Sequence, residues 1–297
     1  MTNRKHVPFT IAMAISILLG LVFFQIPTKL AYAHTFSGNE SAAFIATVGV
    51  LRTEIRLINS TVATNSSQAN EHAKIAVQHL STNDTSELAE RNKRIATDLP
   101  QDLSQLQNMT ANLSPTNATG IAAVKQKVSD TDALLGEALS VRVEPTQLTN
   151  ATVYGTAVAE LLNETLERYG EALGIGANTS SSSSATTSSP TENASMSNAK
   201  IVNCADYQST KGLVNMTSET FNKTKSLVAN TANTNALSKI DTDLNQLKNM
   251  IDNMTSYSQV TTFVYNTIYP DLNSALNLGL SQVDANKAIQ DAMSGAG

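Results

Sequence analysis

Three histidines are the side chains of this chain best suited to bind a metal ion: His34, His72 and His79. His72 and His79 are seven residues apart, so on a helix they share a face and lie about 10 Å apart along the axis. Imidazole is the commonest metal ligand in proteins. Because a seven-residue spacing is loose for a single ion, a ligand from another helix would have to complete a site.

His34 has a second way of binding, because a protease cut after Ala33 would make it the first residue. Its amine and its ring nitrogen could then chelate one ion, and nitrogen ligands suit Cu(II). A third nitrogen from His72 or His79 would give a set similar to the histidine brace of copper proteins. The sequence thus predicts a site for copper or another divalent metal at His34, His72 and His79. The alternative is that His34 is only a chain end, and that His72 and His79 lie between helices, bonded to backbone or carboxylate groups.

The first 33 residues are typical of an export signal. Arg4 and Lys5 give a positive start, and no charge occurs from residue 8 to residue 26. An Ala-Tyr-Ala that ends at residue 33 then fits the small-x-small rule for cleavage. The alternative is a retained anchor, since about 18 apolar residues can just span a bilayer. The rest of the chain is expected to be extracytoplasmic, on the cell surface or secreted, with membrane contact only through an uncleaved signal.

Acceptor motifs for N-linked glycans are dense in this chain. The Ser and Thr content alone would place about six Asn-x-Ser/Thr motifs among the 28 asparagines, yet 14 occur. They predict a glycoprotein, and the alternative is an Asn-, Ser- and Thr-rich surface that is merely hydrated. The acceptors are Asn39, Asn59, Asn65, Asn83, Asn108, Asn112, Asn117, Asn150, Asn163, Asn178, Asn193, Asn215, Asn222 and Asn253.

The composition excludes several classes of partner and activity. Removing the three basic residues of the signal from the 20 Lys and Arg leaves 17 against 25 Asp and Glu, so nucleic acid is not an expected partner. The single cysteine, Cys204, allows no internal disulfide, and stability must come from packing. The chain lacks a Gly-x-Ser-x-Gly elbow, a phosphate loop and a dinucleotide fingerprint. It is therefore not expected to be an enzyme.

Apolar residues recur every three or four positions along most of the chain, which predicts helices. The clearest stripe is Phe44, Val48, Leu51, Ile55 and Ile58. No segment alternates with period two, so no sheet is expected. Further helices are expected at residues 67–80, 121–139 and 151–173.

Start signals for helices involve several of the acidic residues. Ser37 and Glu40 have the spacing of a capping box, and so have Asp84 and Glu87. Glu40 and Glu87 are therefore expected to cap helices rather than to bind an ion. Asp98 is expected to cap the following helix, because proline is tolerated in a first turn.

Residues 174–198 are a low-complexity stretch rich in Ser and Thr. Such a segment cannot bury enough apolar surface to fold, so a flexible linker is expected. The predicted order is a signal peptide at 1–33, a first helical bundle at 34–173, this linker, and a second helical bundle at 199–293. The predicted fold class is all-α, with two antiparallel helical bundles joined by the linker.

Two further features concern the second bundle. "DLSQLQNMTANL", from Asp102, is similar to "DLNQLKNMIDNM", from Asp243. The similarity favours an internal duplication, although amphipathic helices drift toward similar patterns. A kink or break is expected at Pro270.

Four segments carry a resemblance to other proteins: "HTFSGNESAAF", "EHAKIAVQHL", "SELAERNKRIATDLP" and "SVRVEPTQL". Together they resemble poorly characterised exported helical proteins of ammonia-oxidising archaea. The resemblance implies an archaeal envelope with one membrane, heavy N-glycosylation and a copper-dependent metabolism. No residue role follows from it.

These features together predict an exported binding protein of the cell surface, glycosylated on asparagine. The most specific hypothesis is that this protein binds copper or another divalent metal through histidines of the first bundle. The alternative is a structural or protein-interaction glycoprotein of the cell envelope without a metal site. A third hypothesis is a pH-responsive module, because histidines between helices titrate near neutral pH.

Overall fold

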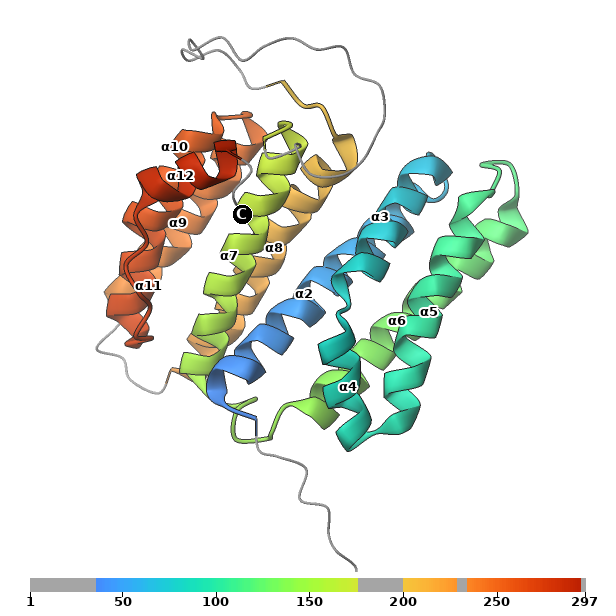
Figure 1. Cartoon of the computed structure of the whole chain (residues 1–297), viewed down its shortest axis with the longest axis horizontal. Coiled ribbons are helices and arrows are strands. Elements are labelled where there is room, and N and C mark those ends of the chain that lie inside the picture. Colours follow the sequence, from blue (N-terminus) through green and yellow to red (C-terminus); the bar gives the residue numbers. More distant parts are fainter. Residues whose placement is uncertain (1–35, 176–199, 229–233, 295–297) are drawn as a thin grey trace, which may run out of the picture. The chain divides into compact units, whose positions relative to one another are not determined.

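Helices make up all the regular structure of the computed structural model within residues 36–175, 200–228 and 234–294, the ranges that it describes (Figure 1). No strand occurs in these ranges, which confirms the all-α prediction. The signal, most of the expected linker and His34 lie outside them. None of the helices in these ranges is both long and apolar enough to cross a bilayer.

Most of the helices follow one another after short connections, and a π-helical turn, η2, joins α10 to α11. Their bounds are α2 Gly38–Thr61, α3 Ser66–His79, α4 Thr82–Arg91, α5 Lys93–Ala111, α6 Ala118–Arg142, α7 Ala151–Ala172, α8 Cys204–Leu227, α9 Thr234–Asp252, α10 Tyr257–Phe263, η2 Val264–Ile268, α11 Tyr269–Leu276 and α12 Ala285–Ser294.

The first core is formed by buried side chains of α2 to α6 and the first two turns of α7, from Ala42 to Ala157. The predicted stripe of α2, from Phe44 to Ile58, is fully buried in it. α2 lies in the first core because its apolar residues follow the helical repeat and face α3, α6 and α7.

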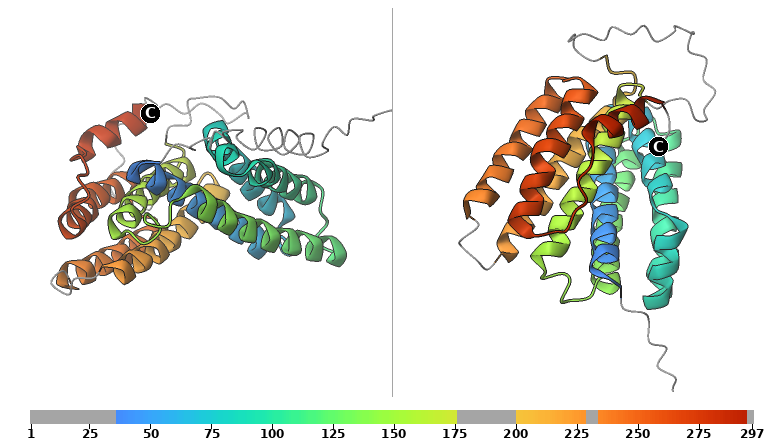
Figure 2. Two further views of the ribbon diagram at one scale, coloured as in Figure 1. Left: turned by 90° about the horizontal axis from the view of Figure 1, so that it is seen from below. Right: turned by 60° about the vertical axis from the view of Figure 1, so that its left-hand side comes forward.

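The second core is formed by the rest of α7 with α8 to α11, from Val158 to Ala275. Figures 1 and 2 show α9, α10 and α11 beside α7 and α8, on the side away from α2. The two cores thus meet within α7, between Ala157 and Val158, and not at the expected linker. A small cluster of Ala46, Val50, Leu161, Leu213 and Met216 also joins α2, α7 and α8.

Packing therefore crosses the expected boundary between bundles. α8, from beyond the expected linker, packs most extensively on α7 and also touches α2. The described residues from 36 onward form one compact unit. The division into separate bundles at 34–173 and 199–293 stays a prediction.

Helix starts follow the expected chemistry at one capping box and depart from it at the next. Ser37 and Glu40 form the predicted box: the Ser37 N–H donates to Glu40 Oε2 at 2.5 Å, and the Glu40 N–H donates to Ser37 Oγ at 3.2 Å. The box predicted for Asp84 and Glu87 is wrong. α4 begins three residues earlier, with Ser81 as the N-cap and Asp84 as the third helical residue.

Because α4 begins earlier, Glu87 is not part of its capping box. It pairs instead with Arg142 from α6. The Arg142 side chain is almost fully buried, and its guanidinium carbon lies 3.3 Å from the centre of the Phe36 ring. The ion pair and the aromatic contact together hold the chain where α2 begins.

The cap predicted at Asp98 is also wrong, because α5 begins five residues before it. Asn92 is the N-cap, and its Oδ1 accepts from the backbone N–H of Arg94 at 3.0 Å. Burial of Ile95 and Leu99 in the first core stabilises the longer helix, with Pro100 inside it. The lost hydrogen bond of the proline is thus outweighed by tertiary packing.

The expected break at Pro270 takes the form of a π turn. Pro270 has no N–H to donate to the carbonyl of Asn266, four residues earlier. The N–H of Tyr269 bonds instead to the carbonyl of Val264, five residues back. The helical path continues through η2 into α11, so the proline changes the winding instead of ending the helix.

Candidate functional site: a buried polar cluster around His72

His72 lies at the centre of a buried contact between three helices. Its Nδ1 is 2.8 Å from Glu54 Oε2 of α2, and its Nε2 is 2.9 Å from Gln208 Oε1 of α8. The His72 and Glu54 side chains are both 0% exposed. Ser209 Oγ lies 3.5 Å from His72 Nδ1. Both ring nitrogens therefore already have protein partners.

A close approach of α2 and α8 places Gln208 within reach of α3. A Cβ added at Gly212, one turn beyond Gln208, would lie only 2.5 Å from Thr53 Cγ2. Thr53 is held in place because its hydroxyl donates to the carbonyl of Gly49 at 3.0 Å. Glycine thus lets the two backbones come together where the polar cluster forms.

The two ring nitrogens of His72 each face an oxygen atom, one of Glu54 and one of Gln208. The second carboxylate oxygen of Glu54, Oε1, is buried and has no hydrogen-bond partner in the ranges that the structure describes. Glu54 is thus the least satisfied member of the cluster.

Arg168 of α7 holds a second group of charges nearby. Its Nη1 lies 2.8 Å from Glu171 Oε2 and 3.5 Å from Asp206 Oδ1. Burial raises the pKa of Asp206 to about 6, the Glu171 charge adds to the rise, and Arg168 opposes it. Glu54 contributes to the same field, so the carboxylates of α2, α7 and α8 are electrostatically linked.

His79 lies at the edge of this cluster, near α7. Its Nδ1 is 3.9 Å from Glu164 Oε2, too far for a hydrogen bond. Burial lowers the pKa of His79, and the Arg168 charge lowers it further. Burial also raises the pKa of Glu164. Burial therefore favours the neutral form of the half-buried His79 imidazole.

Among the residues that the structure describes, His72 and His79 have different partners. His72 contacts Glu54 and Gln208, whereas the carboxylate nearest to His79 is Glu164. Residues 36–175, 200–228 and 234–294 contain no group of three or more His, Cys, Asp or Glu that could hold a metal ion. The metal site that includes His34 stays a prediction, because His34 lies outside these ranges.

The glycan acceptors that the structure describes lie on the surface. Asn178 and Asn193 lie outside the described residues, and the other twelve are all exposed. Of the ten described asparagines without the motif, Asn70 is buried and Asn92 and Asn273 are half-buried. Exposure is what a bulky polar modification requires.

Sequence reasoning missed Glu54, Arg168, Asp206 and Gln208. For Glu54 a signal was present, because it lies three residues after Leu51, on the same apolar stripe. An acid on a buried face needs a partner, and that rule points to a charge or an imidazole on a facing helix. The partners themselves depend on tertiary packing that no local pattern specifies.

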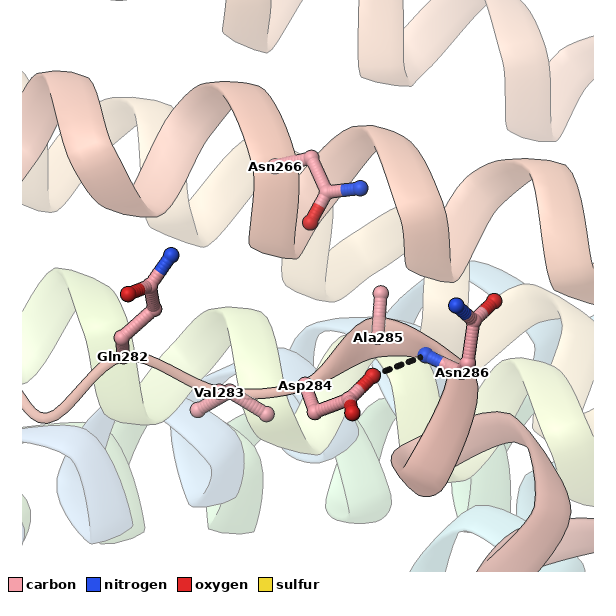
Figure 3. Close-up of a pocket in the computed structure, with 6 residues that line it drawn as sticks. All are labelled: Asn266, Gln282, Val283, Asp284, Ala285 and Asn286. Carbon is pink, nitrogen blue, oxygen red and sulfur yellow. Dashed lines mark hydrogen bonds between the residues drawn. The ribbon is translucent and has the colours of Figure 1, made fainter.

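A shallow polar hollow lies apart from this cluster, beside the π turn (Figure 3). In it Asp284 Oδ1 accepts from the backbone N–H of Asn286 at 2.9 Å. The lining residues are Asn266, Gln282, Val283, Asp284, Ala285 and Asn286. With one carboxylate and no basic group, this lining holds no acid–base pair for catalysis.

Comparisons of the chain with protein-family models, with curated proteins and with solved structures found no match.

Proposed function

We propose that this chain is an exported, N-glycosylated protein of the cell surface that binds another component of the envelope. The main support for this proposal is that all twelve described acceptors are exposed. A glycan is large and polar, so a buried acceptor would count against it. The resemblance to exported archaeal proteins points the same way and stays a prediction.

The interior of the protein favours a structural or interaction role over a metal-binding role. The imidazole of His72 lies between Glu54 and Gln208 and is bonded to both, so it links α3 to α2 and α8. A metal ion at His72 would have to displace one of these bonds and leave a buried group unpaired. The surface is therefore the part of the molecule that we expect to bind a partner.

Fractionation of the native cells, followed by crosslinking, tests this function. We expect the protein in the envelope fraction, crosslinked to a recurring surface partner, and with a mass above that of its polypeptide. Recovery of unmodified chain from the cytosol, with no crosslinked partner, would overturn the proposal.

A second candidate function is copper binding, and the state of His79 favours it. Burial keeps this imidazole neutral, which is the form that binds metals, and Glu164 lies 3.9 Å away. Calorimetric titration of the signal-free protein with Cu(II) tests it, with His34→Ala and His79→Ala as variants. Saturable stoichiometric binding that is lost in both variants would support copper, and no saturable binding would remove it.

A further inference from the structure

The exposed acceptors fall into two classes by their place on the helices. Seven are inside helices and are here named the helix-body acceptors: Asn39, Asn59, Asn83, Asn108, Asn163, Asn215 and Asn222. Five are at helix caps or in a turn and are here named the helix-end acceptors: Asn65, Asn112, Asn117, Asn150 and Asn253.

In a helix-body motif, helix geometry separates the asparagine from the Ser or Thr two positions later. Successive residues turn by about 100°, so an asparagine and the residue two positions later point about 200° apart. The hydroxyl residues Thr165, Thr217 and Thr224 are accordingly 0% exposed, although their asparagines are exposed. Each hydroxyl donates to the carbonyl four residues earlier, at 2.7, 2.8 and 3.0 Å respectively.

This arrangement can produce acceptor motifs without any sugar. A buried threonine is tolerated in these helices because its hydroxyl bonds back to its own helix. Wherever such a threonine follows an exposed asparagine by two residues, the helix produces an acceptor motif. Motifs of this class are therefore expected from packing alone.

Four of the five helix-end motifs present both halves to solvent, and in the fifth, at Asn253, the hydroxyl residue Thr255 is half-buried. At Asn150 the side-chain Oδ1 accepts from the backbone N–H of Thr152 at 2.9 Å, so the amide and the hydroxyl residue lie together. Thr152 is exposed, as are Ser67, Ser114 and Thr119 of three other helix-end motifs. One enzyme site could contact the amide and the hydroxyl residue at the same time.

Resting on the function proposed above, we propose that the native protein carries its N-linked glycans on the helix-end acceptors and leaves the helix-body acceptors bare. The donor is a lipid-phosphate-linked oligosaccharide. The asparagine Nδ2 forms a bond to the anomeric carbon while the carbon–oxygen bond to the phosphate breaks. The bonding electrons leave with the phosphate, and the amide nitrogen loses a proton. The transferase must hold amide and hydroxyl together, which a folded helix prevents.

Two acceptors four residues apart, one in the last turns of α5 and one at its C-cap, give a matched test. Asn108 is followed by Thr110, which is 1% exposed, whereas Asn112 is followed by the exposed Ser114. Asn108→Gln and Asn112→Gln both change an exposed side chain by one methylene. In full-length protein from its own cells, we expect Asn112→Gln to lose the mass of one glycan and Asn108→Gln to lose none.

Peptide mapping of the wild-type protein gives the occupancy of every acceptor and does not depend on how the variants fold. We expect occupancy at least tenfold higher in the helix-end class. Equal occupancy of both classes would overturn this inference and leave the proposed function intact, because transfer would then precede folding. Absence of glycan from every acceptor would overturn the proposed glycoprotein itself, and this inference with it.

Discussion

At the residue scale, the polar interior of this protein is held by paired groups. His72 and Glu54 are both fully buried and lie 2.8 Å apart. Removing one member of such a pair leaves the other uncompensated in a medium of low polarity. The pair therefore contributes to specificity of packing, whether or not it adds net stability.

Replacing His72 by alanine should destabilise the protein strongly. Glu54 would lose its partner, and the expected loss is about 3–5 kcal/mol of unfolding free energy. Urea unfolding followed by circular dichroism measures this loss. The double variant Glu54→Leu/His72→Leu should recover most of it, and His79→Ala should cost less than His72→Ala, because His79 makes no close pair. Equal stability of His72→Ala and the wild-type protein would contradict the account.

Asp206 should make stability depend on pH. Its folded-state pKa of about 6 lies above its ordinary value of 3.8, so its contribution is fully present below pH 3.8 and is lost as the pH rises through 6. Glu164 acts in the same direction, whereas the lowered pKa of His79 favours the folded state above its ordinary pKa of 6.5.

Melting temperatures of the wild-type protein and of Asp206→Asn at pH 4.5 and 7.5 isolate that contribution. Arg168 and Glu171 are left unchanged, so the comparison removes one titrating group. We expect the variant to gain stability at pH 7.5 relative to pH 4.5, by up to about 2 kcal/mol compared with the wild-type protein. An unchanged difference between the two pH values would exclude Asp206 as the source.

At the scale of the helices, the close contact of α2 with α8 sets the position of the cluster. Gly212→Ala would drive a methyl group into Thr53 Cγ2, 2.5 Å away, and the hydrogen bond of Thr53 to Gly49 resists its movement. We expect a loss of about 1–3 kcal/mol in unfolding free energy.

Gly136 on α6 is the matched control for Gly212. A Cβ there would meet Arg52 Nη2 at 3.5 Å, an ordinary contact. Gly136→Ala should therefore leave stability unchanged or raise it by up to about 1 kcal/mol, through its helix propensity. Similar losses in both variants would show that the close approach of α2 and α8 is not what makes Gly212 sensitive.

Helices were largely predictable from the sequence, and their starts less so. The stripe from Phe44 to Ile58 and the Ser37 box depend on neighbouring residues alone, and both are confirmed. At Asp84, two capping patterns overlap and local chemistry does not choose between them. At Asp98, burial of residues on either side extends the helix past its predicted start.

At the scale of the whole molecule, α7 connects the two cores. The similar segments from Asp102 and Asp243 lie on α5 and α9, where Leu103 and Leu244 face the first and the second core respectively. The common pattern thus matches a common packing role, and the duplication stays a prediction. A place for His72 between helices was foreseeable from the sequence, but its partners Glu54 and Gln208 come from other helices and were not.

The central claim is that this protein is exported and glycosylated on its surface. One mass spectrum of the mature protein from its own cells tests that claim most directly. We predict a chain that begins at His34 and is heavier than its polypeptide by whole glycans, on acceptors such as Asn112 and Asn253. A mass equal to that of the bare polypeptide would contradict the claim.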